Sequence, residues 1–438
     1  MRLECNNFSD GTHLLFVLTL VYTGACRNNL AWYPTYYNVH EAVNCAFGPF
    51  QGDNDGGEGE SGGIMMVNKE RMLQEFFELV RIKCSTKDER QVADVLKARL
   101  AELGAAVSED NAGEKIGGSA GNIIANWQGN VSGAPAIMFS AHMDCVEPCA
   151  GVEPKLENGV ITSAGNTILG ADDKAGVAAI LEAMRVMKEQ SIPHGDIQVV
   201  FTIAEEGGLN GSKNIDRAHL RSAMGFVLDS SGSPGEIIMM APGQNKIEVL
   251  VHGKTAHAGI APEDGVNAII VAAKAMSELK DGRIDFETTA NVGNIKGGGA
   301  TNIVPEKVTI VAEARSRNME KLAAQTQHMV ETFERVAAAN KAKAEVKVTK
   351  AYDPFVLTEE MPVVALSKQA VRAIGLEPVL KGTGGGSDAN FFNLYGIPSV
   401  VLGVGMNKVH TSDEFIKEAD LYKTGELVIS IIRQSVDC

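Results

Sequence analysis

Four short, almost continuous apolar runs constrain the fold of this chain more than any other feature of the sequence. They cover residues 136–140, 197–203, 226–228 and 399–402, and they alternate with helical patterns such as that of residues 174–187. Apolar runs without a polar alternation are typical of strands buried on both faces, which occur in parallel sheets covered by helices. The sequence therefore predicts an α/β fold around a mostly parallel sheet.

The middle of the chain follows a different pattern. Between the third and the fourth of these runs, the expected order is strand, helix, strand, strand, helix, strand, which is the order of a ferredoxin-like α+β sandwich. We therefore expect a lid of residues 242–351 inserted into a catalytic domain made of residues 65–241 and 352–438. The lid segments are residues 246–251, 263–279, 288–295, 307–314, 319–339 and 345–350.

Length and charge exclude several classes of function. The chain has 438 residues, of which 45% are hydrophobic, so it can bury a large core and is long enough for more than one domain. Its formal net charge of −15 opposes binding to phosphate backbones, which requires clustered Lys and Arg. We therefore expect neither nucleic acid nor a membrane among its partners.

Residues 1–64 differ from the rest of the chain. The apolar run at residues 14–22 is too short to span a bilayer, although it fits the core of a signal peptide, and residues 52–63 have the Gly, Glu and Asp content of a flexible linker. We expect an atypical extension, with the working protein starting at Met65 or Met66. The seven scattered cysteines fit a reducing compartment. The sequence therefore predicts a cytoplasmic protein, with export as the alternative.

Histidine and acidic side chains follow each of the strand-like runs, where the ligands of an open α/β sheet gather. Asp172 opens the helical segment that begins at Lys174. We expect all these side chains to meet at one edge of the sheet. The others are His142 and Asp144 after the first run, Glu205 and Glu206 after the second, Asp229 after the third and His410 beyond the fourth.

These residue types match the needs of a pair of zinc ions, which take imidazole and carboxylate ligands and share a bridging carboxylate. Asp172 can bridge, His142 and Asp229 can complete one ion, and Glu206 and His410 can complete the other. Each residue alone also fits a turn, a cap or a solvated acidic pair. Only their ordered combination favours a metal site.

Two further carboxylates fit supporting roles. Asp144 can accept a hydrogen bond from the imidazole of His142, which would fix the orientation of the ring. Glu205, next to a candidate ligand, can act as the general base that takes a proton from water. Asp173 is better suited to cap the following helix than to bind metal.

The motifs that carry these residues resemble, in content and order, those of the co-catalytic zinc exopeptidases that include peptidase T and carboxypeptidase G. The resemblance runs from about residue 68 to the C-terminus. It implies a phosphorylase/hydrolase-like zinc-peptidase domain with a lid that also serves dimerisation, the metal ligands and base named above, and two Zn²⁺ ions, which Co²⁺ or Mn²⁺ can replace in vitro. The motifs are HMDC at 142–145, GADDKAG at 170–176, AEEGG at 204–208, LDS at 228–230 and HTSDEF at 410–415.

Motifs of the lid extend the resemblance to substrate binding. His257, in GKTAHAG at 253–259, corresponds to a histidine that helps hold the scissile carbonyl, often across a dimer interface. Asn302 and Arg315 lie in segments that resemble those that hold the peptide backbone and the terminal carboxylate in the family. A turn residue is the alternative for Asn302, and a surface salt bridge or a solvated arginine is the alternative for Arg315. Gly385, in a glycine-rich loop, can turn its amide toward substrate.

The sequence thus predicts an enzyme that hydrolyses short peptides, in the first place a tripeptide aminopeptidase like peptidase T. Because one scaffold hosts several amide hydrolases, a carboxypeptidase or an N-acyl amino acid deacylase stays open. A metal-binding scaffold without catalytic activity is the third alternative.

Overall fold

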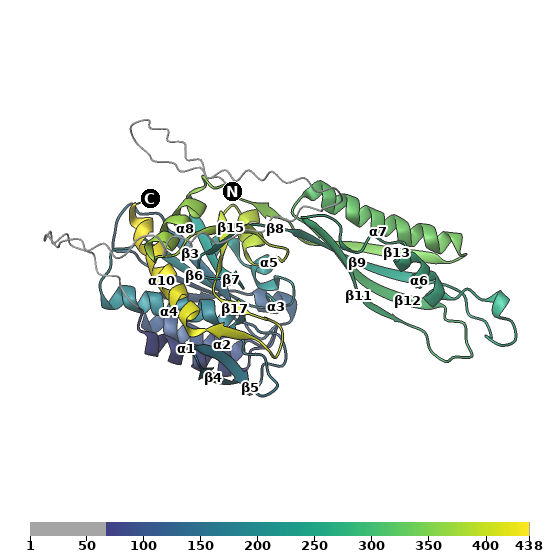
Figure 1. Cartoon of the computed structure of the whole chain (residues 1–438), viewed down its shortest axis with the longest axis horizontal. Helices are drawn as coiled ribbons and strands as arrows, with labels where there is room; N and C mark the ends of the chain where they lie inside the picture. Colours follow the sequence, from purple (N-terminus) through teal and green to yellow (C-terminus); the bar gives the residue numbers. More distant parts are fainter. Residues whose placement is uncertain (1–66, 438) are drawn as a thin grey trace, which may run out of the picture. The chain divides into compact units, whose positions relative to one another are not determined.

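The computed structural model describes residues 67–437 of the chain (Figure 1). The expectations for residues 1–64, and for a start of the working protein at Met65 or Met66, therefore lie outside the described residues. Within residues 67–437, every helix is too short or too polar to cross a membrane.

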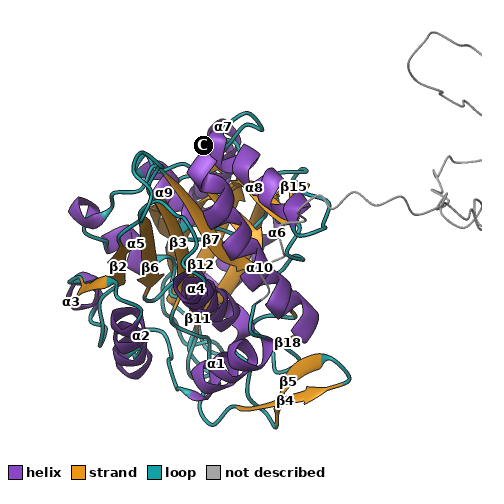
Figure 2. Cartoon of the chain, turned by 90° about the vertical axis from the view of Figure 1, so that its left-hand side faces the viewer, coloured by secondary structure: helices purple, strands orange, loops and turns teal. Residues whose placement is uncertain are grey.

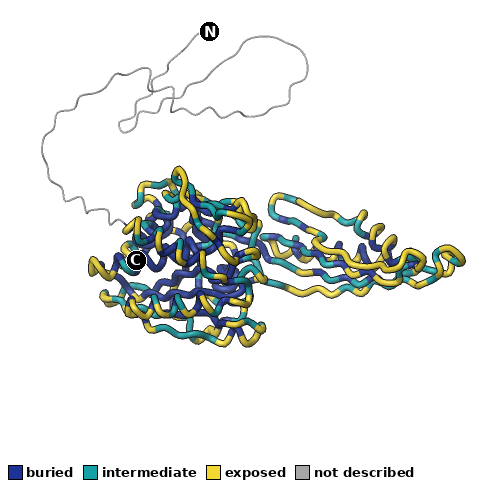
Figure 3. The backbone as a smooth tube through the Cα atoms, turned by 90° about the horizontal axis from the view of Figure 1, so that it is seen from below, coloured by how far each residue is buried: buried dark blue, intermediate teal, exposed yellow. Residues whose placement is uncertain are grey.

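A nine-stranded sheet forms the centre of the larger part. Its four middle strands, β6, β3, β7 and β16, run parallel to one another, and all residues of β3, β6 and β16 are buried. Figure 3 shows buried backbone, in dark blue, inside this larger part. The predicted α/β class is confirmed. In spatial order the strands are β1 (Ala106–Glu109), β2 (Ile123–Trp127), β6 (Ile197–Thr202), β3 (Ile137–His142), β7 (Met224–Ser230), β16 (Ser399–Gly403), β8 (Glu236–Ala241) and β14 (Phe355–Val356), with β15 (Val379–Gly382) paired to β8.

Helices cover this sheet, and α4 (Ala171–Glu189) contacts its middle strands β3 and β7 (Figure 2). A Cβ at Gly176 would lie only 2.7 Å from the carbonyl oxygen of Leu228, so the glycine permits the close approach of α4 to β7. This approach brings Asp172, at the start of α4, close to the strand of Asp229. The other helices of this part are α1 (Lys69–Arg81), α2 (Arg90–Glu102), α3 (Ala112–Ile116), α5 (Asn210–Asn214), α8 (Pro362–Ala373), α9 (Ala389–Leu394) and α10 (Glu418–Gln434).

The inserted segment forms a second, antiparallel sheet with a core of its own. Apart from one additional two-residue strand, the strands and helices follow the predicted βαββαβ order, and both helices pack on the sheet, so the ferredoxin-like lid is confirmed. The elements in spatial order are β10 (Gly282–Arg283), β11 (Thr288–Gly297), β12 (Lys307–Ser316), β9 (Gly243–His252) and β13 (Lys343–Tyr352), with α6 (Ala268–Ser277) and α7 (Met319–Ala339).

The first lid helix begins later than the sequence predicted. We expected a helix from residue 263, but Pro262–Asp264 form a 3-10 turn and the backbone at Gly265 is extended. The side chain of Asn267 accepts hydrogen bonds from the amides of Ile269 and Ile270, and the helix starts there. The cap residue, rather than the apolar pattern, sets the boundary.

A small sheet that the sequence did not predict positions His410. It pairs β17 (Met406–Asn407) with β18 (Phe415–Lys417), and β18 with β5 (Val160–Ala164) and β4 (Glu153–Glu157). His410 lies in the loop between β17 and β18, with a positive φ of 63°. The pairing therefore fixes both ends of the loop that carries this histidine.

Glu109 at the end of β1 provides a test of the fold through pH. Burial raises its pKa, but hydrogen bonds from Arg90, the Gly121 amide and Lys97 outweigh burial and lower the pKa to about 2. Because the folded-state pKa lies below the unfolded one, this carboxylate stabilises the protein above about pH 4.5, and the contribution is lost as pH falls toward 2.

We expect Glu109→Gln to lower the free energy of unfolding at pH 7 by about 1 kcal/mol, after allowance for solvent screening. The difference from the wild type should shrink between pH 4.5 and 3, as urea unfolding at each pH would show. Glu157→Gln, on the exposed edge of β4, is the matched control. A difference that stays constant with pH would contradict the assignment.

Candidate functional site

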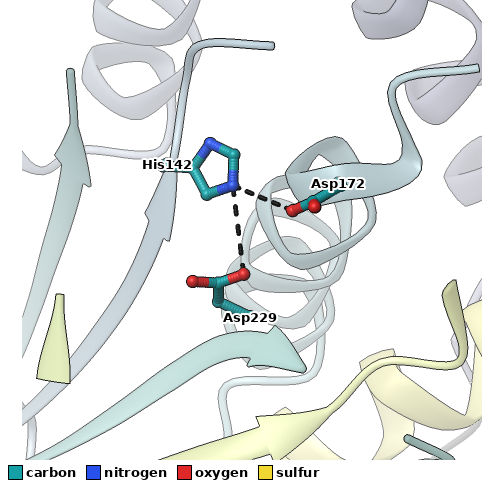
Figure 4. Close-up of side chains that lie close together, drawn as sticks. All are labelled: His142, Asp172 and Asp229. Atoms are coloured by element: carbon teal, nitrogen blue, oxygen red, sulfur yellow. Dashed lines mark hydrogen bonds and ion pairs between the residues drawn. The ribbon is translucent and has the colours of Figure 1, made fainter. Parts of the chain in front are cut away.

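The first group of candidate ligands meets at the carboxyl ends of two parallel strands and the start of α4. His142 is the last residue of β3, and Asp229 lies near the end of β7. Figure 4 shows the carboxylates of Asp172 and Asp229 both directed at the imidazole of His142. The His142 Nε2 atom lies 2.9 Å from Asp172 Oδ1 and 3.9 Å from Asp229 Oδ1. The predicted side chains are therefore close enough to share an ion.

The second oxygen of Asp172 faces a second group. Asp172 Oδ2 lies 3.3 Å from His410 Nε2, which itself lies 2.8 Å from Glu206 Oε1. Glu206 Oε1 is a buried atom. Although His410 Nε2 is near, Glu206 Oε1 accepts no hydrogen bond from the described residues. The two oxygens of Asp172 thus point into two adjacent sets of ligand atoms.

The spacing and charge of these groups fit divalent cations. Tetrahedral ligands on bonds of about 2.0–2.2 Å lie about 3.3 Å apart, which is within the range of the distances above. Burial raises the pKa of Asp229 well above its ordinary value, and the charge of Asp172 raises it further, although His142 lowers it. Cations would relieve this repulsion and supply a partner for the Glu206 oxygen. The ligand atoms of His142, Asp172 and Asp229, and those of Asp172, Glu206 and His410, form groups within 4.8 Å.

The candidate ligands Asp172, Glu206, Asp229 and His410 line a cavity of about 190 Å³, and Glu205 lines it as well. Burial raises the pKa of the Glu205 carboxyl well above the ordinary value, and the nearby charge of Asp229 raises it further. Ligand atoms of Glu205 also lie within 4.8 Å of those of His142 and Glu206, so geometry alone permits it to bind metal as well. Besides carboxylates and small polar residues, the cavity is lined by apolar residues, namely Ile238, Val401, Met406 and Val409.

Asp144 contacts the imidazole of His142, as the sequence predicted, and also holds the turn of the two glutamates. The Nδ1 atom of His142 lies 3.0 Å from the backbone carbonyl oxygen of Asp144 and 3.4 Å from its carboxylate. The carboxylate also accepts hydrogen bonds from Thr86 and from the amides of Glu205 and Glu206. Its backbone orients the imidazole, and its side chain holds the turn that carries the two glutamates.

Two supporting residues were not identified from the sequence. Glu414 is buried and accepts hydrogen bonds from the amides of Leu169, Gly170 and Asp172, so it holds the loop before α4. Lys174 is fully buried, and its Nζ atom donates to the Met143 carbonyl at 2.6 Å. Both residues lie inside the motifs quoted above. A glutamate or a lysine in a motif does not reveal whether its side chain contacts the backbone of the chain or a bound ligand.

The predicted substrate-binding residues fall into two groups. Gly385 lines the cavity. His257 and Asn302 are exposed residues of the lid and do not line it, and Arg315 is paired with Glu313 at 2.8 Å. The described chain by itself therefore brings only Gly385 to the cavity.

Comparison with known proteins shows which family this chain resembles. The model of peptidase family M20/M25/M40 matches residues 138–434. A protein of Bacillus subtilis (strain 168) named Uncharacterized protein YqjE is 46% identical over 370 residues, covering 84% of this chain and 100% of the relative. Peptidase T of Escherichia fergusonii is 27% identical over 394 residues, covering 80% of this chain and 93% of the relative.

Solved structures give the same result. Aminopeptidase PepT from Bacillus cereus ATCC 10987 superposes with a TM-score of 0.78 at 46% identity, covering 84% of this chain and 99% of that one. A tripeptidase from Staphylococcus aureus superposes with a TM-score of 0.82 at 41% identity, covering 85% and 100%. The chain therefore belongs to peptidase family M20/M25/M40 and is a metal-dependent exopeptidase.

Proposed function

We propose that this protein is a two-zinc aminopeptidase that removes the N-terminal residue from tripeptides and similarly short peptides. The single observation that carries the proposal is the position of Asp172, whose two oxygens face His142 and His410 in separate ligand sets. The similarity of the chain to proteins named PepT and tripeptidase supports the choice of substrate. A cavity of about 190 Å³ has room for only a small part of a peptide.

In this proposal Asp172 would be a ligand of both ions, His142 and Asp229 would hold one, and Glu206 and His410 would hold the other. Bound divalent cations would lower the pKa of a shared water and polarise the scissile carbonyl. Glu205 takes the proton from that water at a carboxylate oxygen and later gives it to the leaving amine.

The remaining substrate contacts involve the lid. We assign the backbone amide of Gly385 to the bound peptide, and Asn302 and Arg315 to its backbone and terminal carboxylate. His257 is exposed, which supports a role at the site of a second copy of the chain in a homodimer. Sedimentation of the active enzyme as a monomer would count against this arrangement.

We also assign the protein to the cytoplasm. The three cysteines of the described part, Cys84, Cys145 and Cys149, are free and buried. Such thiols fit a reducing compartment. Cell fractionation that finds the protein outside the cytoplasm would contradict the assignment.

A digest of free and N-acetylated tripeptides, followed by mass spectrometry, tests the proposed substrate. We expect release of the N-terminal residue from the free peptide and little cleavage of the acetylated one. Acetylation removes the charge of the terminal ammonium group by which an aminopeptidase recognises its substrate. Equal cleavage of both would favour the carboxypeptidase or deacylase alternative. A protein that binds zinc but cleaves neither would be a scaffold rather than this enzyme.

A further inference from the structure

The turn that carries Glu205 and Glu206 is held by side chains from three other segments of the chain. Four successive backbone amides, at residues 203–206, each donate a hydrogen bond to a buried side-chain oxygen. The acceptors are Asn122 Oδ1 for Ile203 at 3.1 Å, Glu89 Oε1 for Ala204 at 3.1 Å, Asp144 Oδ1 for Glu205 at 3.0 Å and Asp144 Oδ2 for Glu206 at 3.3 Å. Each acceptor is at least 61 residues away in the sequence from the amide that it binds, so only the folded sheet brings them together.

Glu89 is the least expected of these acceptors. Its side chain is fully buried, and burial raises its pKa to about 7. Oε1 accepts from the amides of Lys87 and Ala204, whereas Oε2 is buried without a hydrogen-bond partner among the described residues. Burying a carboxyl oxygen without a partner destabilises the fold. The stability of the fold therefore does not explain a glutamate at this position.

A helix cap does not explain Glu89 either. It stands at the N-cap position of α2, but its side chain makes no capping hydrogen bond to that helix. The carboxyl instead points to the turn of residues 203–206, which lies 115 residues further along the chain. A cap of α2 would accept from an amide in the first turn of its own helix.

The residue that Glu89 holds is conformationally strained. Ala204 is fully buried and has a φ of +47°, in the left-handed region that residues other than glycine rarely adopt. This conformation sets the direction in which the chain leaves β6 and enters the glutamate pair. A fixed amide at Ala204 is therefore needed to keep the side chain of Glu205 in one place.

We infer that Glu89 is a positioning residue for catalysis: by holding the Ala204 amide through Oε1, it sets where the carboxylate of Glu205 stands in the cavity. The inference rests on the proposed role of Glu205 as the base. Glu89 does not reach the cavity, whose lining residues do not include it. It acts only through the backbone of the turn.

Three substitutions in the full-length, zinc-loaded protein test this role. Glu89→Ala removes both hydrogen bonds and should lower kcat for tripeptide cleavage by about 100-fold, with KM changed by less than about threefold and zinc content retained. Glu89→Gln keeps an acceptor oxygen and should restore kcat to within about threefold of the wild type. Glu89→Asp, which is one methylene too short to reach Ala204, should behave like alanine and serves if the alanine variant does not fold.

Glu182→Ala is the matched control, because Glu182 is also fully buried and accepts from the Asn68 amide, far from the turn. It should lower the melting temperature without changing kcat. The inference is overturned if the alanine and aspartate variants keep kcat, if glutamine does not rescue, or if Glu182→Ala lowers kcat equally. Wild-type protein that cleaves no tripeptide would instead overturn the proposed function, so the two failures are distinct.

Discussion

Replacement of Glu205 by glutamine is expected to lower kcat for tripeptide cleavage by about 10²–10⁴-fold, the usual contribution of a general base. Glutamine has nearly the same size and keeps an acceptor oxygen, but it cannot take a proton from water. Zinc content should stay at the wild-type value, because the proposed ligands are all unchanged. Steady-state kinetics together with metal analysis of the purified variant would measure both quantities.

The neighbouring glutamate supplies the comparison. Glu206 Oε1 lies 2.8 Å from His410 Nε2, and we assign it to a metal ion, so Glu206→Gln should lose zinc as well as activity. Because Glu205 also lies in a candidate ligand group with His142 and Glu206, its own role must be separated from metal binding. If Glu205→Gln lost zinc, Glu205 would be a ligand, and if it stayed active, another group would be the base.

Removal of Asp172 should have a still broader effect. Its oxygens lie 2.9 Å from His142 Nε2 and 3.3 Å from His410 Nε2, so a single substitution takes a ligand from both sets. Asp172→Ala is expected to reduce zinc from about two equivalents to less than one and to leave no measurable peptide cleavage. Inductively coupled plasma mass spectrometry after dialysis would give the stoichiometry.

An aspartate at the surface provides the control for this change. Asp216 is exposed and caps a short 3-10 helix, so Asp216→Ala should keep its zinc and its activity. A variant lacking Asp172 that still held two equivalents of zinc would show that the bridging assignment is wrong. Retention of one firmly bound ion would limit Asp172 to a single metal.

Much of the fold was predictable because burial on both faces leaves a clear trace in the sequence. The apolar runs predicted the parallel strands, and the helix expected over residues 319–339 has the bounds Met319–Ala339 in the structure. The small sheet was missed because β17 and β18 are too short to show a pattern. Its pairing depends on contacts with residues more than 200 positions away.

The candidate site divides in a similar way. His142, Asp172 and Asp229 were predicted to meet because each lies at the carboxyl end of a strand or at the start of a helix beside it. Glu89 and Glu414 could not be assigned, because an isolated glutamate near a helix or a turn gives no indication of which distant amide it accepts from. Such partners become visible only when the register of the sheet is known.

The position of Glu414 also has a consequence for the synthesis of the protein. This carboxylate holds the backbone of Asp172 from 242 residues further along the chain, and His410 lies only four residues before it. The candidate site therefore cannot be assembled until residues 410–414 have left the ribosome, long after Asp172 has emerged. We therefore expect a nascent chain that stops before Glu414 to be unable to hydrolyse peptides, because it lacks the carboxylate that holds the backbone of Asp172.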